Sequence, residues 1–219
     1  MTIPSALSVS AYVTLMAAVA ILVIGLPMAL FLARARSRIR HFVEVLLLFP
    51  LLMPPTVLGY FLLVILGNGS PLVDWFGLKL LFTPYGAAVA GAVVGLPLMV
   101  FTARAAIGAV DPRLEDVART LGANELEVFR DVTLPLAGRG ILAGMLLATA
   151  RATGEFGATL MVAGSIPNRT RTLPIALYES IQLGDSTTAS GIVILLSAVV
   201  LMVVVLLHFL ESDFLRWRS

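Results

Sequence analysis

The chain has 219 residues, of which 59% are hydrophobic and 13% are charged, and its mean hydropathy is +0.99. A soluble domain is typically about 45–50% apolar and about 25% charged, so this composition excludes an ordinary soluble domain and indicates several membrane spans. The sequence pI is 9.4, but the formal net charge is only +2 and the basic residues flank apolar runs. We attribute them to membrane topology and expect no nucleic-acid partner. The absence of cysteine excludes disulfides, thiolate metal sites and cysteine nucleophiles.

Five apolar stretches are long enough to cross a lipid bilayer as helices, since a span needs roughly 20 apolar residues. The first nine residues contain no Lys or Arg, so we expect the first run to be kept as a span and not cleaved as a signal peptide. The sequence therefore predicts an all-α polytopic membrane protein with one domain over residues 1–219. We expect its spans at about 10–33, 42–66, 84–107, 137–163 and 190–210.

The distribution of Lys and Arg predicts the orientation of these spans. Lys79, Arg169 and Arg171 fall on one side, and Arg151 lies inside a span. Basic residues gather on the cytoplasmic side, so we expect N-out, C-in topology with residues 111–135 in the cytoplasm. Trp75 and Trp217 fall near the expected interfaces. The other eleven basic residues lie on the opposite side: Arg34, Arg36, Arg38, Arg40, Arg104, Arg113, Arg119, Arg130, Arg139, Arg216 and Arg218.

Three regions are not expected to be simple spans. Pro50, Pro54 and Pro55 should kink or break the second span, because each proline removes a backbone donor and clashes one turn back. Such breaks are typical of pore-lining helices, but they also occur as packing features. After a turn-rich loop at 67–71, the run VDWFGLKLLF is too short to cross. Residues 164–185 should form an outer loop followed by a short helix at the outer face.

The polar block at 111–135 has the local signals of two short helices. Asp111 before Pro112 is a good N-cap and first-turn pair, and Gly122 is a natural helix stop. Asn124 can cap a second helix, and Leu134-Pro135 is expected to close the block before the fourth span. A compact helix–Gly–helix element could transmit rigid-body motion, whereas the alternative is an ordinary solvated loop.

The spacing within this block resembles a known motif. Asp116-Val117-Ala118 is followed by three residues, Gly122, nine residues and Val132-Thr133-Leu134-Pro135. This pattern is similar to the EAA motif of ABC-importer permeases, in which a short cytoplasmic helix docks on an ATPase. The resemblance implies a type I ABC importer permease fold, although the motif's Glu-Ala-Ala is here Asp-Val-Ala. It assigns ATPase coupling to Glu115, Asp116, Ala118, Gly122, Ala123, Leu134 and Pro135.

The chain carries no signature of chemistry of its own. Its single lysine, Lys79, lies between two leucines, so a Walker A loop is absent and ATP hydrolysis is not expected here. His41 and His208 are isolated, which does not indicate a metal site, and no serine lies in a nucleophile-elbow pattern. We therefore expect no enzyme activity and no cofactor on this chain, with ATP and magnesium bound by a partner.

Longer stretches resemble the molybdate-transport permease family. They include PPTVLGYFLLVILG, DWFG, GLPLMVFTARAAIGAVDPRLEDVARTLGA and ARATGEFGATLMVAGSIPNRTRTLPIALYESIQ. The resemblance implies a homodimer in the bacterial inner membrane, two separate ATPase subunits and a periplasmic or surface-tethered molybdate-binding protein. Together these would import molybdate, and usually tungstate, by alternating access. The alternatives are a sulfate or thiosulfate permease, a secondary transporter, for which inverted repeats would be expected, and a non-transporting scaffold.

Arg151 and Glu155 are charges at membrane depth, which are costly unless they are paired or face water. They lie four residues apart, so on one helix they would share a face and pair. One hypothesis is that Arg151 faces the translocation path, with Glu155 holding its geometry. The other is an ion pair that fixes packing or a closed gate. We favour the second, because a strong fixed cation would trap a dianion.

Overall fold

The computed structural model describes residues 3–35, 38–67, 69–70, 73, 77 and 79–216, and within these ranges every regular element is a helix. The predicted all-α fold class is therefore confirmed. Trp75, Trp217 and three further residues of VDWFGLKLLF (74, 76 and 78) lie outside the described residues. The helices are α1 Ile3–Arg34, α2 Arg38–Leu52, α3 Pro55–Leu66, α5 Pro84–Gly108, α6 Pro112–Thr120, α7 Glu125–Val128, the π-helical turn η1 Phe129–Thr133, α8 Leu134–Thr153, α9 Gly157–Ala163, α10 Leu173–Gln182 and α11 Ser186–Arg216.

Four of the described helices are long and apolar enough to cross a membrane: α1, α5, the continuous segment Glu125–Thr153 and α11. A fifth candidate is the pair α2 and α3, which passes the same test but bends by 114° at its break. The expectation of about five spans agrees with this arrangement. The short helix expected in 164–185 is α10.

The break between α2 and α3 follows from its prolines. Pro54 is extended, with φ −56° and ψ 133°, and Pro55 occupies the first turn of α3, where its missing N–H costs nothing. A residue before proline is pushed out of the helical region, so Met53 and Pro54 cannot continue α2. The sequence predicted a kinked or broken span, and the structure has a break.

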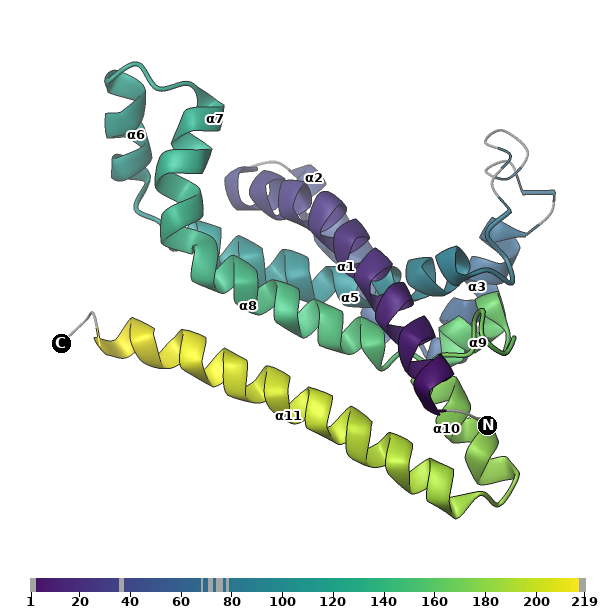
Figure 1. Cartoon of the computed structure of the whole chain (residues 1–219). Helices are drawn as coiled ribbons and strands as arrows, with labels where there is room; N and C mark the ends of the chain where they lie inside the picture. Colours follow the sequence, from purple (N-terminus) through teal and green to yellow (C-terminus); the bar gives the residue numbers. More distant parts are fainter. Residues whose placement is uncertain are drawn as a thin grey trace.

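The core is formed by α1, α5 and α8, which cross one another closely (Figure 1). Ile21, Met99 and Ala148 are fully buried, and each comes from a different one of these helices. Small residues allow the close approach: a Cβ on Gly95 would lie 2.6 Å from the carbonyl oxygen of Ala148. This is the packing expected where lipid, and not water, surrounds the helices. By contrast, α11 runs along the outside of the bundle and leaves most of its apolar side chains exposed (Figure 1).

Two expectations about the fourth span are wrong. The span was expected at 137–163, but α8 ends at Thr153 and α9 begins only at Gly157. Leu134-Pro135 was expected to close the polar block, but the chain continues as one helix over Glu125–Thr153. The physical reason is η1, where the Leu134 N–H bonds to the Phe129 carbonyl five residues back. A wider π-helical turn shifts the preceding carbonyls, so the ring of Pro135 fits without ending the helix.

Candidate coupling site

The helix α6 begins and ends at the residues whose chemistry predicts it. The Asp111 side chain accepts a hydrogen bond of 2.9 Å from the Arg113 N–H, and Pro112 follows in the first turn. At the other end, Gly122 has φ +96° and donates its N–H to the Arg119 carbonyl at 3.0 Å. The Ala123 N–H donates to the Ala118 carbonyl at 3.1 Å, which completes a Schellman motif.

A tight turn then starts the next helix. The Asn124 carboxamide oxygen accepts hydrogen bonds of 3.0 Å from the N–H groups of both Leu126 and Glu127. The Glu127 carboxylate accepts from the Asn124 N–H at 2.7 Å, so the pair forms a capping box. The helix–Gly–helix element expected at 111–135 is therefore present, but its second helix is the start of the fourth span.

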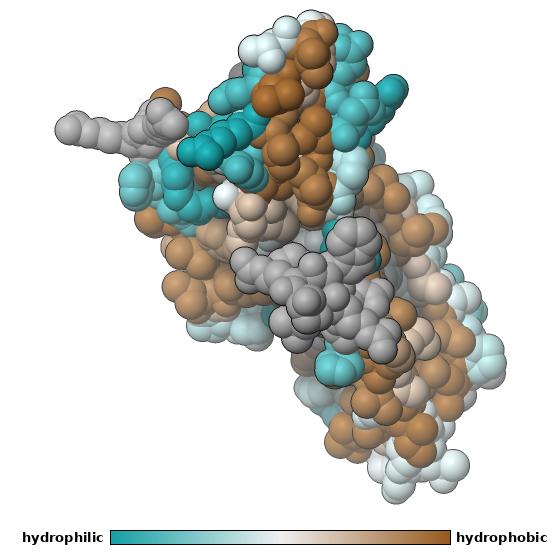
Figure 2. All heavy atoms as spheres, turned by 90° about the vertical axis from the view of Figure 1, so that its left-hand side faces the viewer, coloured by the Kyte–Doolittle hydropathy of each residue, from teal (hydrophilic) through white to brown (hydrophobic). Residues whose placement is uncertain are grey.

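One face of α6 is apolar and exposed among the described residues. Leu114, Val117 and Leu121 lie at i, i+3 and i+7 and are 49%, 56% and 84% exposed. None of the residues of α6 is buried. Figure 2 shows an apolar strip flanked by hydrophilic side chains at the end of the molecule that α6 forms. We call Leu114, Val117 and Leu121 the apolar stripe. Such a rimmed apolar patch outside the spans is typical of a protein–protein contact.

The opposite face of α6 carries a charge network centred on Glu115, whose side chain is 13% exposed. Its Oε1 accepts from Arg34 Nη2 of α1 at 3.0 Å and from the Thr133 hydroxyl at 2.5 Å. Its Oε2 lies 3.5 Å from Arg119 Nη2. Burial by itself raises the pKa of Glu115, but the Thr133 hydroxyl and the Arg34 guanidinium outweigh it and lower that pKa below its usual value. The carboxylate therefore stays ionised at neutral pH.

Arg119 joins the same network from α6. Its Nε donates to Glu125 Oε1 at 2.7 Å, and its Nη1 donates to Asp116 Oδ1 at 2.8 Å. Arg34 also reaches Glu125, with Nη1 lying 3.5 Å from Oε2. The hydrogen bond to Glu125 is the largest contribution that raises the pKa of Arg119. Two arginines thus connect three carboxylates across the α6–α7 corner.

The structure brings together only some of the residues that the sequence assigns to ATPase coupling. Glu115 and Asp116 share the charge network, whereas Ala118 and Ala123 are partly buried at the Schellman turn. Leu134 is partly buried and Pro135 is exposed on the first turn of α8. Sequence reasoning missed the apolar stripe, although its i, i+3, i+7 spacing was visible. It also missed the network partners Arg34, Arg119, Glu125 and Thr133, of which only Arg119 lies on the same helix as Glu115.

The intramembrane pair forms, with Arg151 Nη1 lying 3.0 Å from Glu155 Oε2. The expectation that both lie on one continuous helix is wrong, because Glu155 follows the end of α8. Its Oε1 accepts from the Ala158 N–H at 2.9 Å and so caps the first turn of α9. The Glu155 side chain is 2% exposed and that of Arg151 is 35% exposed. The carboxylate is therefore fully satisfied at the break in the fourth span.

The two broken spans meet at their breaks. A Cβ on Gly157, at the start of α9, would lie 2.9 Å from the Pro55 Cβ at the start of α3. A Cβ on Gly59 would lie 2.9 Å from the Ala158 Cα. Since neither glycine leaves room for a methyl group, α3 and α9 pack backbone to backbone. This contact lies beside the Arg151–Glu155 pair.

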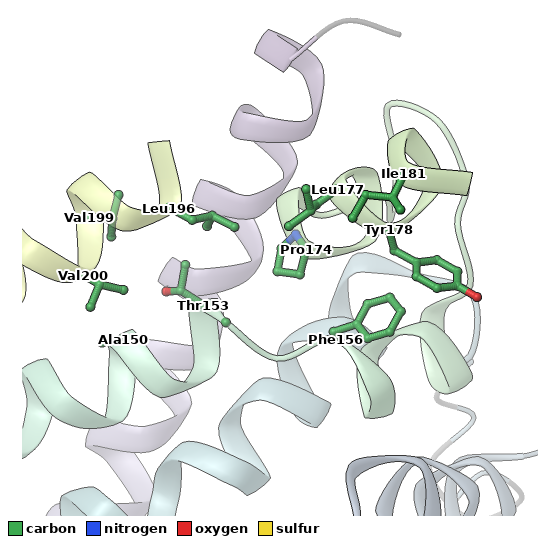
Figure 3. Close-up of a pocket in the computed structure, with 11 residues that line it drawn as sticks. Ala150, Thr153, Phe156, Pro174, Leu177, Tyr178, Ile181, Leu196, Val199 and Val200 are labelled. Carbon is green, nitrogen blue, oxygen red and sulfur yellow. The ribbon is translucent and has the colours of Figure 1, made fainter. Parts of the chain in front are cut away.

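A cavity of about 400 Å³ lies between the end of α8, α10 and α11 (Figure 3). Its wall includes Phe156 and Tyr178, whose ring centroids are 5.0 Å apart, and the hydroxyl-bearing Thr153. Among the described residues, the lining is mostly apolar and includes no cationic side chain. The cavity therefore offers few polar partners to an oxyanion. Within the described part of the chain, no group of three or more His, Cys, Asp or Glu side chains could hold a metal ion.

Comparison with known proteins settles the family. The model for binding-protein-dependent transport system inner membrane components matches residues 21–213. The chain belongs to this family. Its several membrane-length helices agree with that description and make it a multi-pass membrane protein.

Several curated relatives are molybdenum permeases. The molybdenum transport system permease protein ModB of Escherichia coli is 50% identical over 137 residues, which cover 61% of this chain and 60% of that protein. The chain thus spans about 60% of the length of that relative. ModB of Haemophilus influenzae is 41% identical over 77% of each chain. The putative molybdenum permease YvgM of Bacillus subtilis is 36% identical over 85% of this chain and 88% of its own.

Solved structures show the fold. The inward-facing MetNI methionine ABC transporter aligns with a TM-score of 0.71 at 18% identity and covers all of both chains. An amino acid ABC transporter aligns with a TM-score of 0.62 at 21% identity, over 95% of this chain and 92% of that one. The expected type I ABC importer permease fold is therefore confirmed.

Proposed function

We propose that this chain is the membrane-spanning subunit of an ATP-driven importer of molybdate, and of tungstate with it. Two copies of the chain form the permease, two ATPase subunits bind its cytoplasmic side, and an oxyanion-binding protein delivers the substrate from the outside of the bacterial inner membrane. The observation that carries this proposal is the 36–50% identity to permeases named for molybdenum transport. Sulfate or thiosulfate is the second candidate substrate.

The apolar stripe is the surface on which the ATPase docks. Leu114, Val117 and Leu121 project from a helix that buries none of its residues, so a partner can cover them without unfolding anything. An amphipathic helix that lays its apolar face into a groove is a recurring mode of recognition. The charged residues beside the stripe form the rim of this contact.

The intramembrane charges suit a permease that releases its substrate. A free arginine at membrane depth would attract a dianion strongly, but Glu155 lies 3.0 Å from Arg151 and offsets its charge. A dianion that passes this pair is therefore attracted to it only weakly. Selectivity then belongs to the binding protein, and the permease provides a path.

Uptake of radiolabelled molybdate tests the proposal. The chain is reconstituted in proteoliposomes with its candidate ATPase and binding protein, and tungstate and sulfate are offered as competitors. We expect ATP-dependent uptake that tungstate blocks and sulfate does not. Blocking by sulfate instead would favour the second substrate, and uptake that ignores ATP would contradict the proposal.

Variants of the same preparation test the docking surface. Leu121→Asp places a charge at the most exposed position of the stripe and is expected to weaken ATPase binding at least tenfold, roughly the loss at an interface hot spot. Gly122→Ala should also lower uptake, because φ +96° strains any residue with a Cβ. Leu183→Asp is the matched control, since Leu183 is 77% exposed after α10 at the far end of the molecule (Figure 1). Equal losses for Leu121 and Leu183 would mean that the stripe has no special role.

A further inference from the structure

The helix α6 is not anchored by apolar packing. It has no buried residue, and it is joined to the bundle by a short link after α5 and by the turn at Gly122. Nothing in the hydrophobic core therefore determines the angle at which α6 projects. The contacts of its inner face are polar, and the least exposed charged side chain of that face is Glu115.

Arg34 connects α6 to a rigid part of the bundle. It is the last residue of α1, and the turns before it are fixed in the core, where Ala29 and Leu32 are fully buried. From there its guanidinium spans two helices. Nη2 donates to Glu115 of α6 at 3.0 Å, and Nη1 lies 3.5 Å from Glu125 of α7. A cation at a helix C-terminus also interacts favourably with the helix dipole.

Thr133 connects the same carboxylate to the fourth span. It is the last residue of η1, it is fully buried, and its hydroxyl donates to Glu115 Oε1 at 2.5 Å. The following residue begins α8. The Glu115 carboxylate therefore ties α6 to the ends of two core helices, α1 through Arg34 and α8 through Thr133. π-helical turns occur frequently at functional sites, and this one lies at the junction.

We propose that Arg34 and Glu115 are positioning residues of the energy-coupling step. They hold α6 at a fixed angle to α1 and α8, so that a movement imposed on α6 moves both helices as one body. Without this contact, the movement would be absorbed by rotation about Gly122 and about the link before Pro112. The inference rests on the proposed function, in which an ATPase acts on α6.

An ordinary surface ion pair would not hold α6 at a fixed angle, since exposed pairs contribute about 0–1 kcal/mol and hold their side chains loosely. Glu115 differs in two respects. Its side chain is 13% exposed, and three donors from three elements, Arg34, Arg119 and Thr133, converge on its two oxygens. Its rotamer is therefore determined by several contacts at once, which is the condition for transmitting position.

A distance measurement on the permease alone tests the positioning role. The chain has no cysteine, so Val23→Cys on α1 and Leu121→Cys at the end of α6 can carry two spin labels with no background. Val23 lies about 16 Å along α1 from Arg34, at 1.5 Å per residue. In the unaltered permease we expect a narrow distribution of distances between the two labels. Its width should increase at least about twofold in Arg34→Gln and in Glu115→Gln, because both changes break the same network. Arg139→Gln, an exposed arginine on α8 outside the network, should leave it narrow.

The reconstituted importer tests the coupling role. Arg34→Gln should lower the molybdate imported per ATP hydrolysed about three- to tenfold, the range expected for one partly buried contact. The concentration of binding protein at half-maximal uptake should not change. Arg34→Lys keeps the charge and should recover part of the ratio, and the double change with Glu115→Gln should be no worse than either single change.

Both measurements can overturn the positioning role of Arg34 and Glu115. An unchanged distance distribution and an unchanged transport-to-ATP ratio in Arg34→Gln would overturn the inference, as would additive losses in the double variant. If the unaltered importer fails to take up molybdate, the proposed substrate is wrong. The distance measurement still tests the positioning role in that case, because it requires neither substrate nor ATPase.

Discussion

At the residue scale, Glu155 occupies the position where an unpartnered charge would be most costly. It is an almost fully buried carboxylate at membrane depth, and it is satisfied at both oxygens by Arg151 and by the Ala158 N–H. Charges inside a membrane are costly unless such partners exist. The carboxylate therefore serves as the N-terminal cap of α9, a role that the spacing of Arg151 and Glu155 did not suggest.

Replacing Glu155 separates its charge from its capping role. Glu155→Ala is expected to lower the free energy of unfolding by about 1–3 kcal/mol, because it removes the acceptor for a buried N–H as well as the ion pair. Glu155→Gln keeps an acceptor for the Ala158 N–H and removes only the ion pair, so it should cost less than Glu155→Ala. Thermal denaturation of the purified chain in detergent measures both. Equal losses would show that the cap contributes nothing.

At the element scale, the position of each helix depends on how closely its neighbours approach. The α1–α5–α8 core relies on Gly95, where a Cβ would lie 2.6 Å from the Ala148 carbonyl oxygen and 2.8 Å from the Ile21 Cδ1. The α3–α9 contact relies on Gly59 and Gly157 in the same way. These contacts hold broken and unbroken spans together without a water-driven hydrophobic force between helices.

Adding one methyl group tests this packing. Gly95→Ala is expected to destabilise the chain by about 1–3 kcal/mol, because the Ala148 backbone cannot move aside without shifting α8. Gly138→Ala is the matched control on α8, since no atom lies within 4 Å of the Cβ it would add. That change should be neutral or stabilise by up to about 1 kcal/mol through helix propensity. Heating in detergent followed by size-exclusion chromatography compares the two, and similar losses would contradict the close-packing argument.

At the scale of the whole molecule, the two ends differ in chemistry. The α6–α7 element projects from one end, and the turn between α10 and α11 lies toward the other (Figure 1). The sequence places most basic residues in segments expected on the same side as α6. Since positive charge is retained in the cytoplasm, the end with α6 is expected inside and the α10–α11 turn outside.

Cysteine accessibility tests this N-out, C-in topology. The unaltered chain has no cysteine and serves as the unlabelled control. Leu183→Cys and Leu121→Cys are each expressed in cells without the ATPase and treated with a maleimide that does not cross the inner membrane. Leu183→Cys should react in intact cells, whereas Leu121→Cys should react only after permeabilisation. The reverse pattern would place α6 outside, where no ATPase could reach it, and would contradict the proposed function as well.

The sequence by itself determined what depends on neighbouring residues and on composition. Runs of apolar residues indicated about five spans, because length and hydropathy decide what a bilayer accepts, but they did not give the limits of the fourth. Asp111, Gly122 and Asn124 specified the ends of the short helices, because a cap or a stop needs partners only a few residues away. The prolines at 54 and 55 specified the break between α2 and α3 for the same local reason.

Only the tertiary structure decided which helix ends meet. Arg34 and Glu115 are 81 residues apart, and no local pattern indicates that the end of α1 lies beside α6. The break at Gly154–Phe156 was also missed, because Gly154 alone is a weak stop within a long apolar run. Capping involves residues a few positions apart and can therefore be predicted from the sequence, whereas charge pairing between helices depends on the packing of the whole bundle.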